Sequence, residues 1–209
     1  MFLIRMTIKD FGGRVADVWA GLRPLTRKMI VRAMQRGVHP PANSNITFSF
    51  DAHADWELSR LLTALDERAF ETEAQANPEN YREIRRMANA CAAVLQSQTE
   101  SAETFIQLAT RALKRADFTR VDALANALIE RFSAGEMCEI VRQSEHAAIR
   151  ALAMEALALL PTVHLLPLLD DPIYGEIARM TLETQAVEYN SEDAKMLLED
   201  LAAERFFSD

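Results

Sequence analysis

The chain has little glycine, little cysteine and no long apolar run. Six of its 209 residues are glycine and seven are proline, while Ala, Leu, Glu and Arg are abundant. These abundant residues lose little side-chain freedom in a helix, so the composition favours helix over strand. No apolar run reaches the roughly 18 residues that cross a bilayer. Arg5 and Lys9 interrupt the apolar start, so we expect no signal peptide and a cytoplasmic protein.

Motifs for catalysis, metal binding and phosphate binding are also missing from the sequence. Gly12 and Gly13 lack the rest of a phosphate-binding loop, and two lone cysteines have no metal-ligand spacing. Asp51, His53 and Asp55 form the only dense cluster of candidate ligands, and a loop ending in an Asp helix cap explains them better. We therefore predict no catalytic, cofactor or metal residues. A helical enzyme or ligand-binding protein whose site is dispersed along the sequence stays open as an alternative.

Charge is distributed unevenly along the chain. Residues 1–38 hold eight basic and two acidic side chains, whereas the remainder holds 15 basic and 29 acidic ones. Such asymmetry is typical of an interaction surface, but a basic segment can also dock on its own acidic body. Both interpretations stay open at this point.

Local patterns predict an N-terminal arm followed by a helical body. Residues 2–9 alternate between apolar and polar, which indicates a short strand, and residues 46–50 are its candidate partner in a minor two-stranded element. A helix is expected over about 14–36, kinked or split at Pro24. Loop-forming residues fill 37–53, so we expect an arm at 1–53 and a body at 54–209. The helices expected in the body cover about 54–73, 77–96, 100–115, 118–132, 134–143, 145–160, 162–169, 173–188 and 191–207.

The helix over 14–36 is the best candidate for a binding element. Its apolar residues recur at steps of three and four, and basic residues accompany them. This profile suits a helix that docks in a partner's groove or lies on an anionic membrane, and equally one that covers its own core. The candidate partner-binding residues are Trp19, Arg23, Arg27, Lys28, Arg32 and Arg36.

A repeated packing pattern occurs in the second half of the chain. Residues 108–113 match residues 152–157 at a spacing of 44, which is the length of a two-helix solenoid unit. Residues 149–157 read Ile-Arg-Ala-Leu-Ala-Met-Glu-Ala-Leu, and residues 166–172 read Leu-Pro-Leu-Leu-Asp-Asp-Pro. Both stretches resemble HEAT-like helical repeats over about residues 100–190. The resemblance departs from the family at Ile177, where the expected Val-Arg pair is replaced, and at Ser144, where Asp is usual.

The resemblance implies an all-α fold, a right-handed stack of antiparallel helical hairpins of the α-solenoid type. Residues 147–160 are apolar nearly all round, so we expect neighbours on several sides. We expect near-complete burial of Leu152, Ala153, Ala156 and Leu157. The final helix should turn its leucines inward and its acidic residues outward, as a terminal repeat requires.

A helical-repeat scaffold that binds another protein is the function we expect. A DNA-interacting repeat protein using the basic N-terminal helix is an alternative, although the acidic body lacks the basic track that phosphates need. Peripheral membrane contact and a homodimer remain open. The partner's identity does not follow from the sequence.

Overall fold

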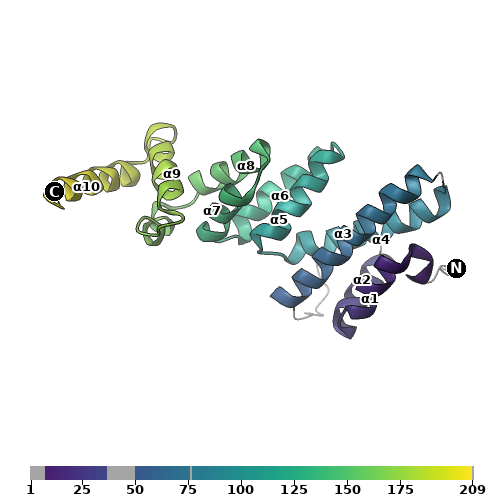
Figure 1. Ribbon diagram of the computed structural model, residues 1–209. Coiled ribbons are helices and arrows are strands. Elements are labelled where there is room, and N and C mark those ends of the chain that lie inside the picture. The colour runs from purple at the N-terminus through teal and green to yellow at the C-terminus, as the bar shows by residue number, and fades with distance from the viewer. Residues whose placement is uncertain (1–7, 37–49, 76, 209) are drawn as a thin grey trace. The chain divides into compact units, whose positions relative to one another are not determined.

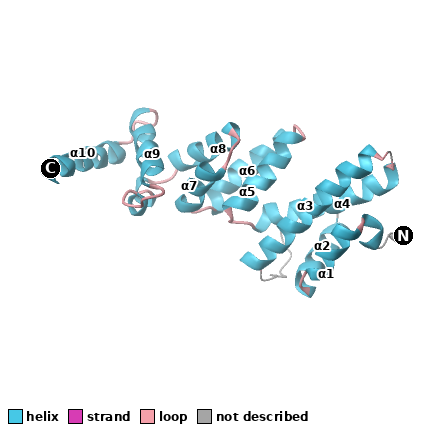
Figure 2. Cartoon of the chain, in the orientation of Figure 1, coloured by secondary structure: helices cyan, strands magenta, loops and turns pink. Residues whose placement is uncertain are grey.

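The chain folds entirely into helices and turns over the residues that the structure describes. The computed structural model describes residues 8–36, 50–75 and 77–208 (Figure 2). No strand occurs in these ranges. Ile8 and Lys9 belong to a 3-10 turn, η1 (Ile8–Phe11), which places Phe11 in the core at 3% exposure. The predicted strand is therefore wrong at this end, and residues 2–7 and 46–49 lie outside the described residues.

Two compact units divide the chain between Thr99 and Glu100. The predicted division at residue 53 lies within the first unit, where the N-terminal helices pack on α3 and α4. The first unit holds α1 (Gly13–Gly21), α2 (Pro24–Arg36), α3 (Ala52–Ala74) and α4 (Pro78–Gln98). Here α3 packs along α4, α1 packs on α3, and α2 packs on α4 (Figure 1).

Pro24 splits the long helix that was predicted over 14–36. Leu22 leaves the helix with an extended backbone, and α2 restarts at Pro24. A proline at this first position removes no helical hydrogen bond, because the first amides of a helix have no intrahelical acceptor. The break lets α1 and α2 contact different helices of the same unit. Buried Val15 and Ile30 mark the faces by which they do so.

The second unit contains a series of short helices, each packed on its near neighbours. They are α5 (Ala102–Lys114), α6 (Phe118–Arg131), α7 (Ala134–Gln143), α8 (Ala147–Ala158), η2 (Thr162–His164), η3 (Leu166–Leu168), α9 (Gly175–Val187) and α10 (Glu192–Ser208). Helix α5 contacts α6 and α7, α8 contacts α6 and α7, and α9 contacts α7, α8 and α10. The helix predicted over 162–169 is replaced by the 3-10 turns η2 and η3. Pro161 and Pro167 flank or interrupt this segment and cannot donate backbone hydrogen bonds.

The 44-residue spacing does not measure one helical hairpin. Its two matching stretches lie in α5 and α8, which are separated by two further helices. Every second helix begins at a shorter spacing than 44: α5 and α7 start 32 residues apart, and α6 and α8 start 29 apart. The Leu-Ala pattern suits any helix that is packed between neighbours. It therefore matched α5 with α8, although these are not the corresponding helices of two successive pairs.

Helix α8 is covered by four neighbouring helices and leaves one face open. Ala153, Ala156 and Leu157 are buried, as predicted for the core, and Ile149 is buried with them. Leu152 is only half-buried, and Leu159 beyond the helix end is 48% exposed. Helix α8 contacts α5, α6, α7 and α9 and leaves an alanine-rich face open, so the predicted near-complete burial of Leu152 is wrong. That open face consists of Ala147, Ala148, Ala151 and Glu155.

The final helix is covered less completely than predicted. In α10 the side chain of Ala194 is buried, but Leu197, Leu198 and Leu201 are half-buried. Glu192, Asp193, Glu199 and Asp200 are exposed as expected. The reason is that α10 packs on α9 at the end of the unit and has few other neighbours.

Gly175 and Gln185 fix α9 against the preceding turns. A Cβ atom on Gly175 would lie 2.6 Å from the Leu169 carbonyl oxygen, so only glycine fits at this start of α9. Gln185 donates from Nε2 to the carbonyls of Ala158 (3.2 Å) and Leu160 (2.7 Å). Its Oε1 accepts from Thr162 Oγ1 at 3.1 Å. These bonds satisfy carbonyls that the end of α8 leaves without helical donors.

Candidate functional site

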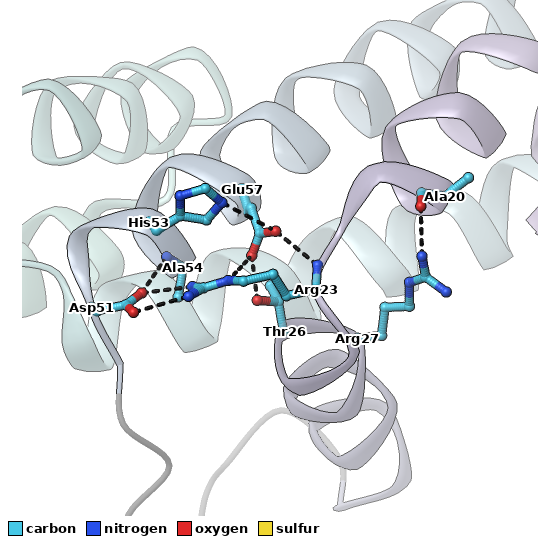
Figure 3. A network of polar contacts seen from close by, with 8 residues as sticks. All are labelled: Ala20, Arg23, Thr26, Arg27, Asp51, His53, Ala54 and Glu57. Atoms are coloured by element: carbon cyan, nitrogen blue, oxygen red, sulfur yellow. Dashed lines mark hydrogen bonds and ion pairs between the residues drawn. The ribbon is translucent and has the colours of Figure 1, made fainter.

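Arg23, one of the predicted binding residues, is held by carboxylates of its own unit. Its guanidinium donates to Asp51 through Nη1 (3.0 Å) and Nη2 (2.6 Å), and to Glu57 Oε2 through Nε (3.1 Å). The backbone N–H of Arg23 donates to Glu57 Oε1 at 2.7 Å, and Thr26 Oγ1 donates to Glu57 Oε2 (Figure 3). Glu57 therefore caps the start of α2 from the neighbouring helix α3. We call Arg23, Thr26, Asp51 and Glu57 the α2 clasp.

Electrostatics keep the α2 clasp ionised at neutral pH. Burial raises the pKa of Glu57, whose side chain is 2% exposed, but the hydrogen bonds from Thr26 and Arg23 outweigh burial and bring that pKa below its usual value. The Arg23 guanidinium and the Ala54 N–H hold the pKa of Asp51 well below its usual range. His53 Nε2 lies 3.6 Å from Glu57 Oε1, so it forms an ion pair when the imidazole is protonated. This arrangement is a structural anchor, since its acceptors are already used.

The other predicted binding residues differ in their exposure and contacts. Arg27 Nη2 donates to the Ala20 carbonyl at 2.6 Å, closing the turn between α1 and α2. Trp19 and Arg32 are half-buried, and Lys28 is exposed. The side chain of Arg36 lies outside the described residues. The apolar stripe of the same helices includes buried Met29 and Ile30, so these helices cover the core of their own unit.

The residues considered as metal ligands or nucleophiles have structural roles. Asp51 caps α3 by accepting from Ala54 N at 2.7 Å, as the cap interpretation predicted. Among the described residues, no group of three or more His, Cys, Asp or Glu could hold a metal ion. Cys91 donates from Sγ to the Leu58 carbonyl at 3.2 Å in the core of the first unit. Burial raises the pKa of the Cys138 thiol to about 11, which suppresses its reactive thiolate.

An open groove lies beside the clasp, between α1 and α3. Its volume is about 510 Å³, and Glu57 and Arg60 line its α3 side. The α1 side and the turn after it contribute Gly13, Arg14, Asp17, Val18, Gly21 and Leu22. Arg14 pairs with Glu67 at 2.6 Å near one end. Two basic residues, Arg14 and Arg60, and two acidic ones, Asp17 and Glu57, line this groove, so the count of charges favours no one class of charged ligand.

The second unit exposes a run of large apolar side chains that were not among the predicted binding residues. They lie after α8, in η2 and η3, in the turns on either side of α9, and within α9 and α10. We call this set the C-terminal apolar surface: Leu159, Val163, Leu166, Ile173, Met180, Val187, Tyr189 and Met196. Their exposed fractions range from 42% at Leu166 to 81% at Val187. Exposed large apolar side chains are typical of binding surfaces where they form a contiguous patch, and these eight follow one another along residues 159–196.

The segment that carries this surface is strongly acidic. Residues 144–209 contain 13 acidic and four basic side chains. Many of the acidic residues, including Glu176, Glu183 and Glu188, are exposed next to the apolar positions in the sequence. Apolar side chains within an acidic field are complementary to apolar and basic groups.

Membrane-span criteria and comparisons with known proteins give no further assignment. No single helix in the described part of the chain is long and apolar enough to cross a bilayer, and the one helix pair that passes together, Ala147–Ala158 with Thr162–Leu168, is bent by 117°. No protein-family model, curated protein or solved structure matches the chain.

Proposed function

We propose that this protein is a helical-repeat scaffold that binds another protein through the C-terminal apolar surface. The observation that carries the proposal is the exposure of eight large apolar side chains between Leu159 and Met196. Exposing that much apolar area to water is unfavourable, at about 25 cal/mol per Å². A partner that covers the area recovers this free energy.

The order of packing in the second unit supports a repeat of the HEAT-like kind. Connections of three residues fold α5 back on α6 and α7 back on α8, and α5 and α6 contact α7 and α8 in turn. The motif that resembles the second helix of a HEAT-like repeat occupies α8. The stretch resembling the end of a first helix and its turn leads through η3 into α9. On this proposal the unit continues as a right-handed stack of antiparallel hairpins.

The charge distribution favours a protein partner over nucleic acid. Arg23 is bound within the α2 clasp, and the segment after residue 143 is strongly acidic. Binding to a phosphate backbone requires a continuous basic track. We therefore do not extend the proposal to DNA.

Site-specific photo-crosslinking tests the proposed function. A photoreactive side chain at Met180, which is 50% exposed, should crosslink to a defined partner in the native cell. The same side chain at Asp122, exposed on α6 of the same unit, should not capture that partner. Equal capture at both positions, or none at Met180, would contradict the proposal.

A further inference from the structure

The outer face of α9 carries an apolar row with the spacing of a helix-packing seam. Met180 and Val187 are seven residues apart, and Ile173 lies seven residues before Met180 in the turn that leads into the helix. Their exposed fractions are 58% for Ile173, 50% for Met180 and 81% for Val187. Residues seven apart on a helix share a face, because seven residues make almost two turns.

The opposite face of α9 is already occupied within the unit. Ala178, Thr181, Leu182 and Gln185 are buried, and Gln185 binds the end of α8. The exposed row is therefore a separate side of the helix rather than a loosely packed core face. A second layer can be added to it without disturbing the first.

Acidic side chains alternate with the apolar row. Glu176 and Glu183 are exposed and occur at helical steps of three and four from Met180 and Val187, which places them on the same face. Arg179 is the single basic residue in the sequence of α9. A helix that packs on this face thus meets Met180 and Val187 in the middle and carboxylates beside them.

We propose that the outer face of α9 binds a basic amphipathic helix of the partner protein. This inference rests on the proposed function and specifies the partner's chemistry. The partner helix would place apolar residues at steps of three and four along the row, with Lys or Arg opposite Glu176 and Glu183. The 13 residues of α9 span about 20 Å, which matches a partner segment of three to four turns. The flexible side chain of Met180 accommodates apolar groups of different shape.

A pair of synthetic helices supplies the test on the full-length protein. One peptide of about 18 residues carries leucines at steps of three and four with flanking lysines, and its twin carries glutamate at every lysine position. We expect the basic peptide to bind, as measured by fluorescence anisotropy, and the acidic twin not to bind. The double variant Glu176→Lys/Glu183→Lys should weaken basic-peptide binding about tenfold and allow the acidic twin to bind.

Matched variants separate this face from general attraction to an acidic protein. The double variant Glu103→Lys/Asp122→Lys makes the same change in net charge at exposed positions of α5 and α6, and it should leave binding unchanged. Met180→Gln/Val187→Gln should weaken binding about tenfold, whereas Ile129→Gln, at a 46% exposed position of α6, should not. Thermal melts establish that each variant is folded.

Several results would overturn the inference and leave the proposed function standing. Equal weakening by both charge-reversal pairs would show general electrostatic attraction only. A crosslink from position 180 to an acidic or non-helical segment of a partner would assign other chemistry to this face. Self-association of the full chain that Glu176→Lys/Glu183→Lys removes would give the face to a second copy. Failure of the proposed function is distinct, because it appears as loss of the crosslink itself.

Discussion

A single buried carboxylate, Glu57, joins the start of α2 to α3. It accepts hydrogen bonds from the Arg23 N–H, the Arg23 guanidinium and Thr26. A donor left buried without its acceptor costs more than an ordinary hydrogen bond contributes. Much of the attachment of α2 therefore depends on one side chain of another helix.

Replacing Glu57 by alanine should destabilise the first unit by roughly 2–4 kcal/mol. Urea unfolding followed by tryptophan fluorescence measures the change, since Trp19 and Trp56 both lie in this unit. Glu67→Gln is the control, because Glu67 forms only a surface ion pair with Arg14 and should contribute less than about 1 kcal/mol. Equal effects of the two substitutions would contradict the role assigned to Glu57.

Stability of the first unit should also fall in acid. The pKa of Glu57 is lower in the folded protein than its usual value near 4.5. A lowered pKa means that the ionised form binds the fold more favourably, so the stabilisation is complete above the usual pKa and is lost as the pH falls through the folded pKa. Unfolding free energies of wild type and Glu57→Gln, measured between pH 7 and pH 3, should converge toward the acid end. A constant difference would refute this.

Gly175 provides a prediction for the second unit. Gly175→Ala places a Cβ atom 2.6 Å from the Leu169 carbonyl oxygen, so the turn or α9 must move, at a cost of roughly 1–3 kcal/mol. Gly135→Ala is the matched control in the same unit. Its nearest neighbour would be Ser133 Oγ at 3.9 Å, and alanine should stabilise α7 slightly. Thermal melts of the two variants should therefore shift in opposite directions.

Helix caps were predictable at the residue scale, but contacts between helices were not. Asp51, Asn77 and Ser133 cap the helices that follow them, and an Asp cap was the predicted role of the cluster at 51–55. Glu136 Oε2 accepts from Ala102 N at 2.8 Å in another helix. Glu57 acts in the same way on α2. Both bonds join residues 34 apart, and no local pattern reveals such a pair.

Helix α8 offers a comparison of two leucines that are close in sequence and different in burial. Leu157 is 0% exposed, and Leu159 is 48% exposed. Leu157→Ala should cost roughly 2–5 kcal/mol through lost burial and a cavity, whereas Leu159→Ala should cost less than about 1 kcal/mol. Chemical denaturation followed by circular dichroism measures both. Similar losses of unfolding free energy at the two positions would show that Leu159 is covered as well.

The positions of the helices could be predicted from the sequence, but which face of each helix is buried could not. Apolar periodicity located α3 to α9 within a few residues, and it failed where two prolines turned 162–169 into 3-10 turns. Burial on α8 was overestimated because composition says how apolar a helix is, while its neighbours decide which side is covered. Leu152, which was expected to be nearly fully buried and is half-buried, shows this difference.

Across the whole molecule, the N-terminal helices belong to the first unit, so their removal should affect that unit. A chain of residues 39–209 lacks α1 and α2 and exposes the faces of α3 and α4 that they cover. Hydrogen exchange should show loss of protection in α3 and α4 and retained protection in α5–α8. Unchanged exchange in α3 and α4 would mean that α1 and α2 are a detachable arm.

The candidate site shows the same limit on prediction from sequence. The basic residues near Arg23 were conspicuous in the sequence, yet the α2 clasp uses Arg23 for attachment within the unit. The row from Ile173 to Val187 was present in the sequence at a spacing of seven. Which side of α9 would remain open became clear only from the packing of Ala178, Leu182 and Gln185.

Each unit contains one buried cysteine, whose thiol can report how often that unit opens. Cys91 lies in the core of the first unit and Cys138 in that of the second, and both are 0% exposed thiols. A thiol reagent reaches either sulfur only when the surrounding helices separate. The labelling rate therefore measures how often these helices separate. Mass spectrometry of the two labelled peptides would give the opening rate of each unit in the same molecule, without any introduced cysteine.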